Sequence, residues 1–174
     1  MARGNDEPLA VRRRSCLGLL VAAPVLAQPR PLTDFLPLLR NQLLPTVNRA
    51  YRRTRLASRV VFLGQPKLQS EKTLQVRMIE RWPLFKPPVL QMLLIERQVS
   101  FAQARGRWWL VESTFTVQAL PPETPLGPTP RQYLDETAPL SNPTVGTFGL
   151  NFSDGAFAQA LRELLDQWQD GYLR

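Results

Sequence analysis

The sequence contains no histidine and a single cysteine, Cys16. It therefore lacks the side chain that most often acts as a general base near neutral pH. One cysteine can form neither a disulfide within the chain nor a cysteine and histidine cluster that holds zinc. The sequence also has no P-loop, no Rossmann glycine pattern and no serine-hydrolase turn. We therefore expect no catalysis, no cofactor and no metal site.

Long hydrophobic runs are absent too. The apolar stretch near the N-terminus covers residues 16–26 and is well short of the roughly 20 residues that cross a bilayer as a helix. Three arginines at 12–14 precede it, and small or aliphatic residues at 25–27 resemble a signal-peptidase site. We predict a twin-arginine-like signal peptide at 1–27 and one exported domain at 28–174, peripheral to a membrane in the periplasm or thylakoid lumen.

Acidic residues are scarce in the first third of the predicted domain, because none lies between Asp34 and Glu71. The signal peptide holds four of the 22 basic and two of the 14 acidic residues, which leaves a net charge of +6. Five arginines gather in the acid-free stretch: Arg49, Arg52, Arg53, Arg55 and Arg59. Spacings of three residues would place several of them on one helical face. This face is either simply solvated or binds an acidic subunit or anionic lipid, whereas nucleic acid is not expected for an exported chain.

Alternation of apolar and polar residues predicts a sheet over residues 73–119. Three alternating runs cover 73–82, 89–102 and 107–119. Two short breaks separate these runs, which favours an antiparallel meander. The first half of the middle run is apolar on both sides, so we expect it to be a central strand. Short runs at 59–63 and 148–152 would add a first strand and an edge strand, for four to five strands in all.

Helices are predicted at both ends of the domain. Residues 32–58 have an apolar period near four, interrupted by Pro45, which should kink the helix or start a second one. A C-terminal helix should begin at Ser153 or Asp154 and cover one face of the sheet. Its apolar stripe is Phe157, Leu161, Leu164, Leu165 and Trp168. Between sheet and helix, residues 121–143 hold seven prolines and should form a proline-rich arm. The predicted fold class is α+β.

The predicted hairpin at 105–109 carries two arginines and two adjacent tryptophans. Side chains of neighbouring strand residues point to opposite faces. We place Trp109 in the apolar alternation of its strand and treat Arg105, Arg107 and Trp108 as candidate residues for binding a partner. The alternative is that a helix or the proline-rich arm covers Trp108.

Three strand glutamates follow one another at a spacing of 16 residues: Glu80, Glu96 and Glu112. One hairpin register places Glu96 opposite Glu112, as a pair of carboxylates that a hydrolase could use. A register shifted by two instead places Thr114 opposite Glu96. The alternative is that these glutamates form cross-strand ion pairs with arginines such as Arg77, Arg81 and Arg97.

A Gly-x-Trp hairpin that follows a helix, within residues 107–117, resembles the curved sheet of NTF2-like and cystatin-like domains. The resemblance implies a small apolar ligand held between the sheet and the C-terminal helix. Such a carrier is our alternative function. The function that we predict first is a non-catalytic accessory or assembly factor, which binds an acidic membrane subunit or anionic lipid through its basic helical face.

Overall fold

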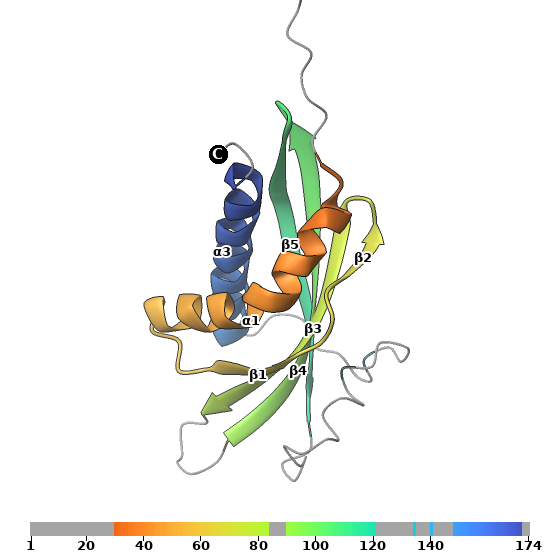
Figure 1. Cartoon of the computed structure of the whole chain (residues 1–174). Coiled ribbons are helices and arrows are strands. Elements are labelled where there is room, and N and C mark those ends of the chain that lie inside the picture. Colours follow the sequence, from red (N-terminus) through yellow and green to blue (C-terminus); the bar gives the residue numbers. More distant parts are fainter. Residues whose placement is uncertain (1–29, 84–89, 121–133, 135–139, 141–147, 172–174) are drawn as a thin grey trace, which may run out of the picture.

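The computed structural model describes residues 30–83, 90–120, 134, 140 and 148–171. They form an open antiparallel sheet with helices on one face, which confirms the predicted α+β class (Figure 1). The elements in order are the 3-10 turn η1 (Leu32–Phe35), α1 (Leu36–Arg53), β1 (Arg59–Leu63), β2 (Lys67–Ser70), β3 (Thr73–Pro83), β4 (Leu90–Ala104), β5 (Arg107–Ala119) and α3 (Phe148–Asp170). The predicted signal peptide lies outside the described residues.

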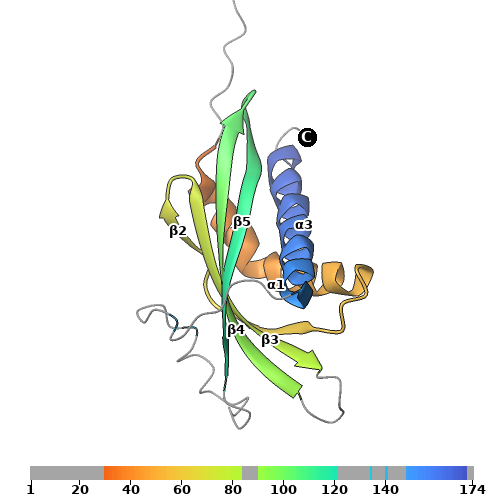
Figure 2. The same ribbon diagram turned by 180° about the vertical axis from the view of Figure 1, so that it is seen from behind.

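The sheet has the strand order β1-β3-β4-β5, and the short strand β2 also pairs with β3. Strands β3 and β4 pair without interruption from Thr73 opposite Ser100 to Pro83 opposite Leu90. Both helices cover the same face of this twisted sheet, as the two opposite views show (Figures 1 and 2). In the described part of the chain, no helix is both long and apolar enough to span a bilayer.

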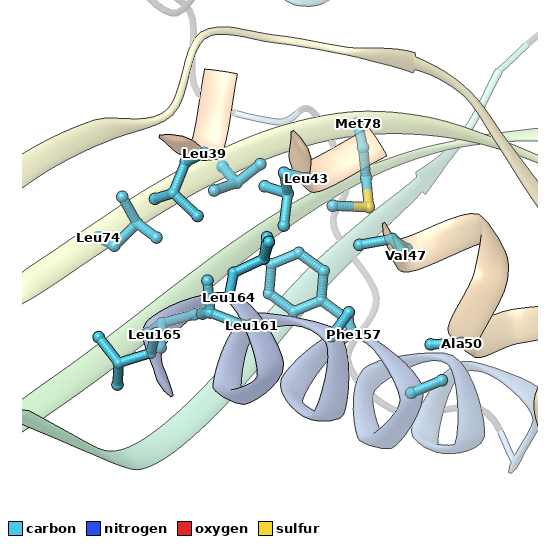
Figure 3. Packing of buried hydrophobic residues seen from close by; sticks show 14 of the residues in the cluster. Leu39, Leu43, Val47, Ala50, Leu74, Met78, Phe157, Leu161, Leu164 and Leu165 are labelled. Atoms are coloured by element: carbon cyan, nitrogen blue, oxygen red, sulfur yellow. The ribbon is translucent and has the colours of Figure 1, made fainter. Parts of the chain in front are cut away.

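The main core lies between the two helices and the inner face of the sheet. The predicted apolar stripe of α3 is buried along its whole length, and it packs against residues of α1 such as Leu39 and Leu43 (Figure 3). Strand β3 contributes Leu74, Val76 and Met78 to the same core, because alternate side chains of a strand share one face. The C-terminal helix therefore covers the sheet as the sequence predicts.

A smaller core occupies the outer face of the sheet. It contains Ile79, Met92, Leu94 and Leu120, with half-buried neighbours that include Leu134 and Leu140. Leu94 is buried on this face and Ile95 on the inner face, which confirms β4 as a central strand. Most of the predicted proline-rich arm lies outside the described residues, but Leu134 and Leu140 pack on the outer core.

Helix α1 runs through Pro45 and changes direction along its length, as a proline inside a helix causes (Figure 1). It ends at Arg53, whereas the sequence predicts helix as far as residue 58. Arg55 has a left-handed backbone with φ of 58°, and its N–H donates to the carbonyl of Arg52. The N–H of Leu56 donates to the carbonyl of Tyr51. This hydrogen-bond pattern closes a helix C-terminus, so Arg55 leaves the helical face predicted for it.

Residues 148–152 form the first turn of α3, so the predicted edge strand there is wrong. Alternation over five residues is too short to distinguish a strand from a helix with one buried face. Because the helix starts earlier, Ser153 and Asp154 lie inside α3 and do not cap it.

The β4–β5 pairing contains a bulge, with Ser100 opposite Glu112 but Phe101 opposite Leu110. The extra residue is Val111, and it reverses the alternation of side chains along β5. As a result Trp109 is 52% exposed, whereas Trp108 is only 4% exposed. The prediction that Trp108 is exposed and binds a partner is therefore wrong. The alternative, in which the rest of the protein covers Trp108, is confirmed.

The same pairing separates the two glutamates of the predicted carboxylate pair. Glu96 lies opposite Thr116, and Glu112 lies opposite Ser100. The register that joins Glu96 to Glu112 is therefore wrong, as is the register that joins Glu96 to Thr114. Cross-strand ion pairs form instead, because Arg77 Nε lies 2.6 Å from a carboxylate oxygen of Glu96.

Candidate functional site

The predicted cluster of five arginines divides into separate groups in the structure. Arg49 and Arg53 both reach across to Glu163 of α3, at 3.1 and 3.2 Å from its two carboxylate oxygens. These exposed ion pairs add little stability, but they provide the two arginines with a counter-charge. Arg49 and Arg53 are therefore poor candidates for binding an external anion.

Arg52 and Arg59 instead line a hollow of about 360 Å³. The hollow lies where the end of α1, the start of β1 and the end of β3 meet, in the lower left of Figure 1. Its lining consists of Asn48, Arg52, Leu56, Ala57, Ser58, Arg59 and Arg81. We call it the basic hollow, because three of these residues are arginines and none is acidic.

Arg59 and Arg81 are directly opposite each other in the pairing of β1 with β3. Side chains at such positions project from the same face with Cβ atoms about 4.5–5.5 Å apart, and like charges there are destabilising. Within the described residues, the side chains of Arg52, Arg59 and Arg81 form no ion pair or hydrogen bond. The lining of the hollow therefore includes three arginines whose side chains have no counter-charge within the described residues.

Hydrogen bonds hold α1 and β1 together beside the hollow. The side chain of Asn48 donates to the carbonyl of Val60 and accepts from its N–H, both at 3.0 Å, so α1 is joined to the backbone of β1. Ser58, just before β1, is buried, and its hydroxyl has no hydrogen-bond partner in the described part of the chain. Ser58 lines the basic hollow, but its hydroxyl oxygen is closed to solvent.

The hairpin residues predicted to bind a partner mostly hold the sheet to α3. Arg107 lies 2.7 Å from a carboxylate oxygen of Asp170 and 3.4 Å from one of Asp166. The hydrogen bond that Arg107 donates to the Asp170 carboxylate is the main cause that raises the pKa of Arg107. Trp108 donates its indole N–H to the carbonyl of Arg30 at 2.7 Å. Arg105 alone of the three is exposed, in the turn with φ of 52°.

Sequence reasoning missed a buried polar network between the helices and the sheet. The guanidinium of Arg97 lies 2.6 Å from the hydroxyl of Ser153, 2.8 Å from Asp154 and 3.2 Å from Glu80. The Tyr51 hydroxyl donates to the Glu80 carboxylate. The side chains of Arg97 and Glu80 are both 0% exposed. The network thereby links α1, β3, β4 and α3.

The surroundings of the network explain how these charges remain buried. The indole N–H of Trp82 donates to Glu80 at 2.9 Å, and the guanidinium of Arg97 lies over the ring of Phe157 at 4.9 Å. Burial lowers the pKa of Arg97, but the surrounding charges, including Glu80, outweigh it and raise the pKa overall. Burial and then the Glu80 charge raise the pKa of Tyr51. Arg97, Glu80 and Tyr51 are closed to solvent, and only Asp154 is partly exposed, so the network acts mainly on stability.

The arrangement offers little for other chemistry. In the part of the chain that the structure describes, no three acidic side chains gather closely enough to hold a metal ion. The space between the helices and the inner face of the sheet is occupied by side chains such as Leu43, Met78 and Phe157 (Figure 3). We therefore take the basic hollow as the candidate ligand-binding feature among the described residues.

No family model, no curated protein and no solved structure matches this chain. The resemblance to NTF2-like and cystatin-like domains therefore stays a prediction.

Proposed function

We propose that the protein is a non-catalytic accessory or assembly factor that binds an anionic group of a membrane partner in the basic hollow. The observation that carries the proposal is the direct opposition of Arg59 and Arg81 beside a hollow that no acidic residue lines. Two like charges at paired strand positions lower the stability of the free protein. An anion that enters the hollow removes this repulsion, and its binding stabilises the folded state.

The setting of this function comes from the N-terminal sequence pattern. In the proposal, the segment 1–27 exports the chain to the periplasm or thylakoid lumen, where it meets an acidic subunit or an anionic lipid at the membrane surface. The intact mass of protein from its native host should then correspond to a chain that begins near Gln28. Recovery of the full-length chain would remove the proposed compartment.

The non-catalytic part of the proposal is supported by the positions of the strand glutamates. Glu80 is fully buried in the polar network, and Glu96 is paired with Arg77. Glu112 lies on β5 opposite Ser100, apart from both. A hydrolase of the predicted kind needs two carboxylates facing one substrate, and this arrangement does not support one.

The proposal is tested with vesicles of phosphatidylglycerol and with poly-glutamate, which represent anionic lipid and acidic protein. The double variant Arg59→Gln/Arg81→Gln should bind neither probe well. The matched control is Arg40→Gln/Arg162→Gln, which removes two charges at exposed positions outside the hollow. The control should bind whichever probe the wild type binds.

Salt and stability complete the test. Binding should weaken between about 0.01 and 0.15 M salt, since the Debye length falls from about 30 to 8 Å. Arg81→Gln should raise the unfolding free energy at low salt by about 0.2–1 kcal/mol, because it removes a like-charge pair. Equal loss of binding in both double variants, or no binding of either probe by the wild type, would refute the proposal.

A further inference from the structure

We infer that two copies of this chain associate through strand β5, which forms an open edge of the sheet. Strand β5 stands at the end of the order β1-β3-β4-β5, so one of its sides has no neighbouring strand. The backbone N–H and C=O groups along such an edge are ready to pair with a strand of another chain. The basic hollow lies at the opposite edge, beside β1 and β3, so this inference goes beyond the proposed function.

The two edges of the sheet differ in how well they resist such pairing. The far edge is divided between β1 and β2, which have five and four residues, and the pairing of each with β3 is irregular. Strand β5 has 13 residues. From Trp108 to Ala119 it contains no proline and only one charged residue, Glu112. Short strands, irregular pairing, prolines and charges protect a sheet edge, so the edge at β5 is the less protected one.

The pairing of β5 with β4 determines which backbone groups face the open side. The N–H of Leu120 donates to the carbonyl of Met92, at the start of β4. Backbone groups of successive residues point to alternate sides of a strand, so the outward groups belong to every second residue before Leu120. These outward residues are Ser113, Phe115, Val117 and Ala119. Within the described residues, no hydrogen bond occupies their outward N–H and C=O groups.

The part of the edge near the β4–β5 hairpin is closed by α3. The side chain of Gln169 accepts from the N–H of Trp108 at 2.6 Å and donates to its carbonyl at 3.2 Å, as a neighbouring strand would. Asp154 of the same helix accepts a hydrogen bond from the Ser113 hydroxyl. Helix α3 therefore lies along β5 between these two contacts, and Figures 1 and 2 show β5 continuing beyond the start of α3. Pairing with another strand is thus confined to the stretch from Ser113 onward.

A second copy of β5 matches this stretch. The four outward residues are centred on Thr116, so an antiparallel pair with its two-fold axis at Thr116 joins them all to one another. Ser113 then lies opposite the partner's Ala119, and Phe115 lies opposite the partner's Val117. Each of these pairs exchanges two backbone hydrogen bonds, so every outward group obtains a partner. A contact of this kind uses the same surface patch on both copies, as a two-fold dimer requires.

The side chains of the stretch are compatible with the two-fold axis. Thr116 lies opposite its own copy and Thr114 lies opposite the partner's Gln118, and all of these side chains are uncharged. Threonine pairs stabilise neighbouring strands, whereas like charges in opposite positions destabilise them. The single acid, Glu112, lies beyond the four outward residues and faces no acid of the partner. Each copy of α3 runs from Ser113 toward the hairpin, away from the axis, so the two helices diverge.

The first test is disulfide trapping in the full chain, with Cys16→Ser to remove its single cysteine. Thr116→Cys in this background should form a disulfide-linked dimer under mild oxidation. Opposite residues that do not share hydrogen bonds have Cα atoms about 4.5 Å apart, which suits a disulfide. The matched control is Thr114→Cys, on the same face of the strand. Its two copies would be four residues apart along the pair, or roughly 14 Å, and should remain unlinked.

The second test follows association in solution. In analytical ultracentrifugation, the mean mass of the unmodified chain should rise from monomer toward dimer as its concentration increases. Thr116→Lys places two like charges directly opposite each other and should weaken the dimer by about fivefold or more. The control Gln98→Lys adds the same charge at an exposed position of β4 and should not. The amides of Phe115 and Val117 should exchange hydrogen more slowly in the dimer.

Several results would overturn the inference. These are a monomer at all concentrations up to about 1 mM, equal linking of Thr116→Cys and Thr114→Cys, or a dimer that Thr116→Lys does not weaken. Slower exchange of the Phe115 and Val117 amides only in a complex with a different protein would assign the edge to that protein and exclude self-pairing. Anion binding in the basic hollow is measured separately and depends on none of these outcomes.

Discussion

Replacing Arg97 with methionine should lower the free energy of unfolding by about 3–5 kcal/mol, the usual cost of breaking a buried ion pair by removing one partner. The guanidinium of Arg97 lies 3.2 Å from Glu80, and neither side chain has any exposed surface. At an effective dielectric constant of about 20, two unit charges at this distance attract by roughly 5 kcal/mol. Methionine preserves much of the apolar stem and removes the guanidinium, which lies over the rings of Phe115 and Phe157, so the loss is mainly electrostatic.

The assay is urea unfolding followed by tryptophan fluorescence, because Trp108 and Trp168 are buried in the main core. A second substitution, Glu80→Gln, isolates the cause. In the wild type it should destabilise, whereas in the Arg97→Met background it should restore part of the loss, because the unpaired buried carboxylate is then gone. A loss below about 1 kcal/mol for Arg97→Met, or a further loss when Glu80→Gln is added, would refute the account of the network as a charged, desolvated cluster.

Three further predictions concern other parts of the core. Burial, followed by the Glu80 charge, raises the pKa of Tyr51, so the folded state keeps a proton that the unfolded chain releases above about pH 10. The free energy of unfolding should therefore fall above that pH. Thermal unfolding should show a smaller loss of stability at alkaline pH in Tyr51→Phe than in the wild type. Leu161→Ala should cost about 2–5 kcal/mol in urea unfolding, because this side chain of α3 is fully buried; a loss below about 1 kcal/mol would make α3 peripheral. Trp108→Ala should cost about 3–5 kcal/mol and Trp109→Ala about 0.5 kcal/mol or less; equal effects in the same assay would contradict the reversed alternation of β5.

The strands and the C-terminal helix could be predicted because their side-chain periods are set by one dominant core. Leu74, Val76 and Met78 alternate in β3, and Phe157 and Leu161 recur at the helical period. The bulge at Val111 could not be predicted this way. One extra residue reverses which alternate positions face the core, and both of the neighbouring tryptophans are apolar enough for either face.

The sequence predicts only two of the three arginines that line the basic hollow. Arg52 and Arg59 stand out in a stretch without acids, but Arg81 joins them only through the pairing of β1 with β3, and β2 separates those strands in the chain. The buried network left one visible signal. Glu80 continues the core-facing alternation of Met78, yet a single charged residue in a strand also fits a register shift or a surface position. Its partners become known only from the tertiary structure.

The buried network also bears on the order in which the chain can fold. Its members include Tyr51 in the first helix and Ser153 in the last, so more than half of the polypeptide separates them. Contacts between residues so distant in sequence form late, since closing the intervening loop costs chain entropy. During synthesis, Arg97 and Glu80 must remain hydrated until α3 has left the ribosome and reached the sheet. A chain truncated before α3 would expose both charges and an apolar sheet face to water. Docking of the last 27 residues is therefore the step that commits the domain to its folded state.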